Sequence, residues 1–197
     1  SFHGAGEFPF LIGENGISLI PITSIQPAYE VSSERITTGV PQLDTMLGGQ
    51  GYYRGNSILV SGEAGTGKTS LAAHLAHASC QRGERCLYFA FEESEHEIIR
   101  NMCSIGIDFQ PWLKEDLLRF RSSRATMYGL EMHLVTMIRE INAFQPRVVI
   151  LDPVTNLLST GSLNEVQVMV SRMIDFLKGK GITGLFTTLT GSEFQES

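Results

Sequence analysis

Short runs of apolar residues recur along the chain from Glu34 onward and are separated by longer stretches with helical spacing. Continuous apolar runs of this length are typical of strands that are buried on both faces of a parallel sheet. We therefore predict strands at Ser57–Ser61, Cys86–Phe91, Leu117–Phe120, Val148–Leu151 and Gly184–Thr188.

The intervening stretches predict helices. Lys68–Gln81 is rich in alanine, and Ser94–Ser104 opens with a serine that is followed three residues later by Glu97, the pattern of a capping box. Apolar residues also recur at helical spacing in two further stretches, at Leu130, Leu134, Met137, Ile138 and Ile141 and at Val166, Val170, Met173, Ile174 and Leu177. Strand and helix in alternation predict an α/β domain, with a mostly parallel sheet flanked by helices and joined by right-handed crossovers.

The N-terminal part of the chain has a different pattern. The stretch EFPFLIGENGISLIPI predicts a β-hairpin that turns at Gly13-Glu14-Asn15-Gly16. A lone hairpin is marginally stable in water, so we interpret residues 1–23 as the remnant of a preceding domain. Residues 24–33 are polar, include Pro27 and read as a linker. Residues 34–197 then form the α/β domain, which we expect to be truncated at its C-terminus.

The stretch GEAGTGKT follows the first predicted strand and opens the first predicted helix, and it fits the pattern G-x-x-x-x-G-K-[ST]. Glycines allow the backbone N–H groups to curl around a phosphate, and the helix adds the positive end of its dipole. Lys68 would reach the outer phosphates, and the Thr69 hydroxyl would hold the accompanying Mg²⁺. The predicted phosphate-binding residues are Gly62, Glu63, Ala64, Gly65, Thr66, Gly67, Lys68, Thr69 and Ser70. The alternative is a chance glycine turn before a lysine.

Three carboxylates follow predicted strands. The run RVVILDP ends its strand in Asp152, as expected of a residue that orients the metal ion. Glu92 and Glu93 follow the strand Cys86–Phe91, and parallel strands present their C-terminal ends to one crevice. We predict that Glu92 accepts or orients the proton of an attacking water and also contributes to the metal site, with Glu93 assisting. The alternative places both glutamates in solvent at a favourable helix N-terminus.

Other polar residues carry weaker signals. His74 and His77 lie three apart on one helix but have no evident partner ligand, so we expect them to be packed or exposed, and we expect His96 and His133 at the surface. The arginines in RFRSSR could contact nucleic acid, a neighbouring subunit's phosphates or only solvent; they are Arg119, Arg121 and Arg124. A threonine at the end of the last strand could sense the γ-phosphate, and the candidates are Thr187, Thr188 and Thr190.

Composition narrows the class of protein. The 197 residues are 42% hydrophobic and 18% charged, with a net charge of −6, which is typical of a globular protein and argues mildly against a nucleic-acid binder. The three cysteines, Cys80, Cys86 and Cys103, show no CxxC spacing and favour a reducing compartment. No apolar run is long enough for a membrane span. We therefore predict a cytoplasmic protein.

Several stretches together resemble the KaiC family of the RecA-like ATPases: ERITTGVPQLDTMLGG, the phosphate loop, FAFEES, GID and VVILDP. This resemblance implies a RecA-like core and the second domain of a tandem protein. It also implies ATP and Mg²⁺ bound between the protomers of a ring, usually a hexamer. In this family the first glutamate of the pair, here Glu92, is the general base. Second domains of the clock protein also phosphorylate and dephosphorylate a serine and a threonine, so an autokinase role and regulatory protein partners are expected.

The sequence also departs from the clock proteins. Ile105 stands where their second domains have a tryptophan near the adenine, Gln50 interrupts a triple glycine, and the phosphoacceptor region would fall beyond Ser197. Two alternative functions stay open. One is a RecA/RadA-type DNA-dependent ATPase, which the acidic balance disfavours. The other is a nucleotide-gated assembly scaffold with little turnover.

Overall fold

A five-stranded parallel sheet forms the centre of the domain in the computed structural model, which describes residues 10–13, 16–19, 32–127 and 129–190. The strand order across the sheet is β5-β9-β8-β6-β7, and every neighbouring pair is parallel. The bounds are β5 Ser57–Gly62, β6 Cys86–Ala90, β7 Leu118–Ser122, β8 Val148–Asp152 and β9 Thr183–Leu189. The five predicted strands are thus confirmed, although β7 continues two residues past its predicted end.

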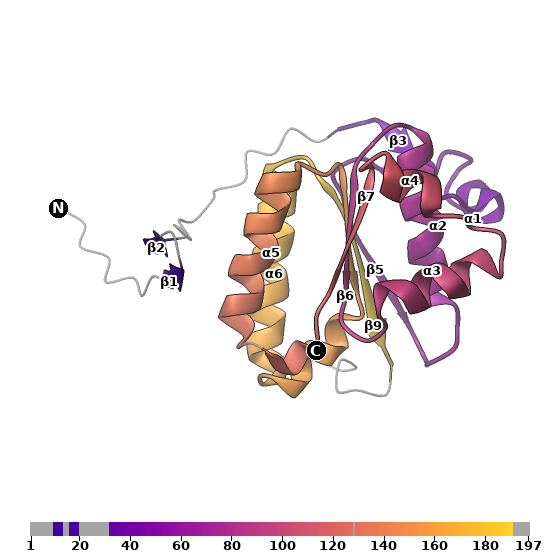
Figure 1. Cartoon of the computed structure of the whole chain (residues 1–197). Helices are drawn as coiled ribbons and strands as arrows, with labels where there is room; N and C mark the ends of the chain where they lie inside the picture. The colour runs from indigo at the N-terminus through magenta and orange to yellow at the C-terminus, as the bar shows by residue number, and fades with distance from the viewer. Residues whose placement is uncertain (1–9, 14–15, 20–31, 128, 191–197) are drawn as a thin grey trace.

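Helices cover both faces of this sheet (Figure 1). The helices α2, α3 and α4 lie on one face, and α5 and α6 pack side by side on the other. Their bounds are α2 Lys68–Gln81, α3 Glu95–Cys103, α4 Gln110–Lys114, α5 Leu130–Phe144 and α6 Leu163–Gly179, with the 3-10 turns η1 Ala125–Met127 and η2 Val154–Ser159 between them. The four predicted helices are present, and the capping box of Ser94 and Glu97 is confirmed at the start of α3.

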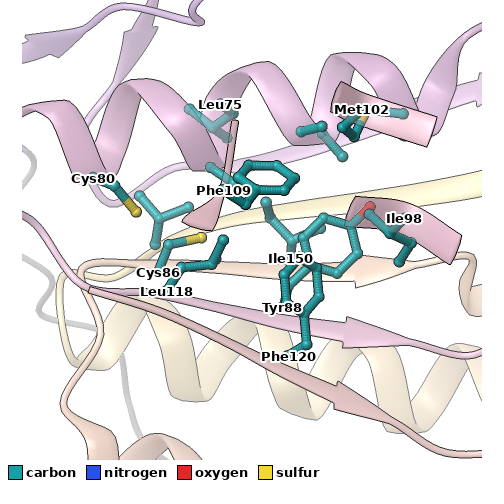
Figure 2. Close-up of a cluster of buried hydrophobic side chains, with 14 of the residues drawn as sticks. Leu75, Cys80, Cys86, Tyr88, Ile98, Met102, Phe109, Leu118, Phe120 and Ile150 are labelled. Carbon is teal, nitrogen blue, oxygen red and sulfur yellow. The ribbon is translucent and has the colours of Figure 1, made fainter. Parts of the chain in front are cut away.

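The two faces of the sheet bury two separate hydrophobic clusters. Successive residues of a strand point to opposite faces, so Tyr88 and Ile150 belong to the cluster under α2 and α3, whereas Leu87 and Val149 belong to the cluster under α5 and α6. Figure 2 shows part of the first cluster, with Tyr88 from β6 close to Ile150 and Phe120. Both faces of β6 and β8 are buried, which explains their uninterrupted apolar sequences.

Smaller elements precede the sheet. The predicted hairpin is confirmed in its strands, because β1 Phe10–Gly13 pairs antiparallel with β2 Gly16–Leu19; the turn residues 14 and 15 lie outside the described residues. Most of the predicted linker lies outside them too. Next, β3 Arg35–Ile36 pairs with β4 Tyr52–Tyr53, and the short helix α1 Pro41–Met46 lies between them in the sequence.

The prediction that His133 lies at the surface is wrong. Its side chain is only 3% exposed, and its ring meets Phe91 edge to face with 5.9 Å between centroids. The residue adjoins Leu134 and Met137 on the inner side of α5, so the helix buries it together with its apolar neighbours. Among the described residues, no helix is both long enough and apolar enough to span a membrane.

Candidate nucleotide site

Three segments converge at the C-terminal edge of the sheet. The phosphate loop follows β5, Asp152 ends β8, and Glu92 and Glu93 follow β6, which is the neighbour of β8. They line one cleft of about 400 Å³. Its lining is Ala64, Gly65, Gly67, Lys68, Thr69, Ser70, Glu92, Glu93, Ile98, Asn101, Met102, Ile105, Asp152, Pro153 and Leu189. The structure therefore brings together most of the predicted site residues, from loops that follow three different strands.

The phosphate loop depends on glycine conformation. Gly65 and Gly67 have φ of 78° and 87°, in the left-handed region where other residues are strained. A Cβ at either position would meet no atom within 4 Å, so the backbone angle is what requires glycine there. Thr66 closes the turn by donating its hydroxyl to the carbonyl oxygen of Glu63 at 2.8 Å. Helix α2 then begins at Lys68 without a side-chain cap, so its first-turn N–H groups are available to an anion.

Lys68 holds its charge inside this loop. Its side chain is only 9% exposed, and Nζ donates to the carbonyl oxygens of Gly62 at 2.9 Å and Glu63 at 2.6 Å. A lysine ammonium has three protons to donate, so one remains for a ligand in the cleft. The ammonium is thus prepositioned where the loop would hold the outer phosphates.

Asp152 is buried and fixed by hydroxyl groups on both oxygens. Its residue is 6% exposed, Tyr88 donates to Oδ2 at 2.6 Å, and Thr187 donates to Oδ1. The Tyr88 contact was missed from the sequence, where Tyr88 looks like one more apolar strand residue. Thr187 is fully buried, and its hydroxyl donates a hydrogen bond to Asp152. The sequence alone offers Thr187 as a possible contact to the γ-phosphate.

The two glutamates have different surroundings. Glu92 is exposed in the cleft, whereas Glu93 is half-buried, and its Oε2 is buried with no hydrogen-bond partner. Burial raises the pKa of Glu93, and the nearby negative charges of Asp152 and Glu92 raise it further, with a small offset from Asn101. A carboxylate that is crowded by other carboxylates in this way favours a bound cation.

We expect Glu93→Gln to stabilise the nucleotide-free protein near pH 8. A raised pKa means that the folded state favours neutral Glu93 more than the unfolded state does. The resulting stabilisation of the folded state is present below the ordinary pKa of about 4.5 and is lost as the pH rises through the higher pKa of the folded state. Removing the charge should raise the Tm by at most about 2 °C, because Glu93 is only half-buried and solvent screens part of the repulsion. The gain should vanish below about pH 4, where glutamate is already neutral.

Thermal melts in chelator at pH 4 and pH 8 measure this effect. Glu115→Gln is the matched control, because Glu115 is exposed at the end of α4 and lies outside the cleft lining. A Glu93→Gln variant that is less stable than wild type at pH 8 would show that the carboxylate makes a favourable contact in the folded state.

The weaker sequence signals lie elsewhere. His77 is packed, because Trp112 donates Nε1–H to its Nδ1 at 3.0 Å. Arg119 pairs with Asp116, and Arg121 with Glu140, at or beside the edge strand β7. None of these residues lines the cleft. Sequence reasoning also missed the wall that α3 contributes through Ile98, Asn101 and Met102, which are separated by helical spacing and carry no chemical motif.

The residues present fit a magnesium nucleotide. The loop and the start of α2 offer N–H groups, one cation and the Thr69 hydroxyl, and Glu92, Glu93 and Asp152 add carboxylates to the same cleft for a divalent metal. Among the described residues, no group of three or more His, Cys, Asp or Glu side chains could hold a metal ion by itself. This agrees with the habit of Mg²⁺, which binds through one or two carboxylates together with substrate phosphates.

Comparisons with known proteins agree with this geometry. A family model described as "ATPase: KaiC" matches residues 36–196. The chain is 54% identical over 191 residues to the circadian clock protein KaiC2 of Synechocystis, and the match covers 97% of this chain and 34% of that protein. It is 39% identical to KaiC3 of the same organism, covering 95% and 37%, and 37% identical to the circadian clock oscillator protein KaiC of Picosynechococcus, covering 95% and 36%. The chain thus spans about a third of the length of these relatives.

Proposed function

Because the chain belongs to the KaiC family of ATPases, we propose that it binds Mg-ATP in the cleft at the C-terminal edge of its sheet and hydrolyses it there. The observation that carries this proposal is the meeting of Lys68, Asp152 and Glu92 in one cleft, although they follow or end three different strands. Each residue alone could have a purely structural or solvent-exposed role. A phosphate-binding loop that faces paired carboxylates, however, is the arrangement that phosphoryl transfer needs.

Each residue has a distinct part in the proposed reaction. The N–H groups of the loop and the start of α2 bind the phosphates, and Lys68 Nζ donates to the outer ones. Thr69 and Asp152 would hold Mg²⁺, with Glu92 near it; the ion would neutralise charge on the β- and γ-phosphates. Glu92 orients a water and takes its proton. Glu93 would assist as the second carboxyl group beside that position in the cleft.

The α3 wall is the candidate contact for the base. Ile105 is 52% exposed and lines the cleft together with Met102 and Asn101. An isoleucine offers apolar contact to an adenine but no ring to stack on it. We therefore propose that the base is held by apolar packing on Met102 of α3 and on Ile105, just beyond the end of that helix, instead of by aromatic stacking.

Assembly and phosphotransfer extend the proposal. We infer that protomers of the full-length protein form a ring, usually a hexamer in this family, with ATP at each interface, and that regulatory proteins bind this ring in the cytoplasm. A serine or threonine hydroxyl in place of water would support autophosphorylation in the same cleft. Phosphopeptide analysis of the full-length protein after incubation with Mg-ATP tests that activity, and sedimentation with and without nucleotide tests the ring.

Phosphate release by the full-length protein tests the central proposal. We expect release that requires Mg²⁺, is abolished by chelator and is unchanged by DNA. Nucleotide binding without release would favour an assembly scaffold. Release that is stimulated by DNA, with DNA affinity falling steeply as salt rises, would favour a recombinase.

A further inference from the structure

We propose that Tyr88 is a positioning residue for the magnesium site, because its hydroxyl fixes the carboxylate of Asp152. The inference rests on the proposed function above. It assigns a role to a residue that lies in the hydrophobic core and carries no motif. Tyr88 does not line the cleft, so it would act only through Asp152.

The register of the sheet places these groups together. Tyr88 on β6 pairs with Ile150 on β8, and Ala90 pairs with Asp152, so the tyrosine is the diagonal neighbour of the aspartate on the same face. On the other side, β9 pairs with β8 through Leu151 and Phe186, which brings Thr187 next to Asp152. Three adjacent strands thus contribute one acceptor and two hydroxyl donors to a single face.

Burial makes the hydroxyl contact directional. The Tyr88 residue is 0% exposed, and its ring packs against Phe120 with 5.2 Å between centroids. Figure 2 shows the hydroxyl oxygen turned toward Ile98 of α3, the helix that forms one wall of the cleft. The ring cannot move without disturbing a packed core, so the O–H bond is held on Oδ2 at 2.6 Å. A donor this rigid sets the direction in which the remaining lone pairs of Asp152 point.

Both carboxylate oxygens of Asp152 accept a hydrogen bond from a hydroxyl group. Thr187 holds Oδ1 and Tyr88 holds Oδ2, so rotation of the carboxylate would break both bonds. Groups that hydrogen-bond to a metal-binding carboxylate orient it for the metal. Loss of such a group usually lowers metal affinity or activity by about 10–100-fold. Tyr88 carries the only hydroxyl group among the five residues of β6, CLYFA.

The test is Tyr88→Phe in the full-length protein, read by the Mg²⁺ dependence of binding of a fluorescent ATP analogue. The change removes one oxygen and keeps the ring, so the core packing is retained. We expect the Mg²⁺ concentration at half-saturation to rise about 10-fold. The affinity for the nucleotide without Mg²⁺ should stay within twofold of wild type, because the phosphate loop is untouched. The turnover number at saturating ATP should fall more than KM changes.

Background variants separate positioning from packing. If Tyr88 acts through Asp152, Tyr88→Phe should have no further effect on the Mg²⁺ midpoint in an Asp152→Asn background, since coupled residues are not additive. Thr187→Val should shift the midpoint in the same direction, and Thr187→Ser, which keeps the hydroxyl, should restore it. Tyr52→Phe, which removes a half-buried hydroxyl outside the cleft lining, is the matched control.

An unchanged Mg²⁺ midpoint in Tyr88→Phe, or an equal shift in the wild-type and Asp152→Asn backgrounds, would overturn the inference. Failure of the proposed function looks different, because the wild-type protein itself would then show no Mg²⁺-dependent nucleotide binding.

Discussion

Glu92→Gln should slow phosphate release by at least about 100-fold and leave nucleotide binding intact. Glutamine has nearly the same shape as glutamate but accepts no proton, so the variant loses the general base and keeps the cleft. Removing such a group typically lowers the rate by about 10²–10⁴-fold. The affinity for Mg-ATP should change by less than about threefold, because Lys68 and the phosphate loop bind the phosphates independently of the exposed Glu92.

Single-turnover phosphate release and equilibrium binding, measured on the same preparation, separate these two effects. Glu95→Gln is the matched control, since Glu95 opens α3 three residues later and lies outside the cleft lining. Glu93→Gln discriminates between the paired carboxylates: it should slow release less than Glu92→Gln. If Glu93→Gln proves the more damaging of the two, the base is the half-buried carboxylate with the raised pKa.

The sheet and its helices were predictable because their signals are local. A buried parallel strand must be apolar along most of its length, as in CLYFA and in VVILD up to its final aspartate. The glycine spacing of the loop reflects the two left-handed residues that it contains. The glutamate pair could be placed in the cleft because all strands of a parallel sheet end on one side. Those inferences needed only strand direction, and strand direction follows from the alternation of strand and helix.

Contacts that depend on register could not be read in the same way. The sequence does not say that Tyr88 lies one diagonal step from Asp152, since that requires both the strand order and the pairing of Ala90 with Asp152. His133 was misplaced for a related reason: a polar ring was assigned to solvent before the inner side of α5 was known. A useful signal was present in both cases, namely a polar atom on an aromatic ring within an otherwise apolar surface.

Lys68→Ala should remove most of the affinity for nucleotide. Its ammonium is the cation that the cleft lining supplies from the phosphate loop, and charged hydrogen bonds of this kind are worth about 1.5–3 kcal/mol each. Loss of the contacts to the outer phosphates should weaken ATP binding by about 100-fold. ADP should be affected less, because it lacks the γ-phosphate. Titration of a fluorescent analogue measures both affinities.

The backbone contacts of Lys68 predict that Lys68→Ala leaves folding largely unaffected. Nζ donates to the carbonyl oxygens of Gly62, which ends β5, and Glu63, which opens the loop; neither residue is buried, so water can replace the ammonium there. The Tm of Lys68→Ala should therefore stay within about 2 °C of wild type. Lys178→Ala, on the exposed side of α6, is the matched lysine control. An affinity within threefold of wild type would contradict a phosphate-binding role for Lys68.

Lys68→Arg separates the contribution of the positive charge to ATP binding from the contribution of the compact ammonium shape. Arginine keeps the positive charge, but its planar guanidinium cannot replace a compact ammonium whose three protons are shared between two loop carbonyls and a ligand. We expect the arginine variant to bind ATP more weakly than wild type and more tightly than Lys68→Ala. If it binds as tightly as wild type, the cleft attracts phosphate by net charge alone. The fixed position of Nζ against the loop would then contribute nothing to recognition.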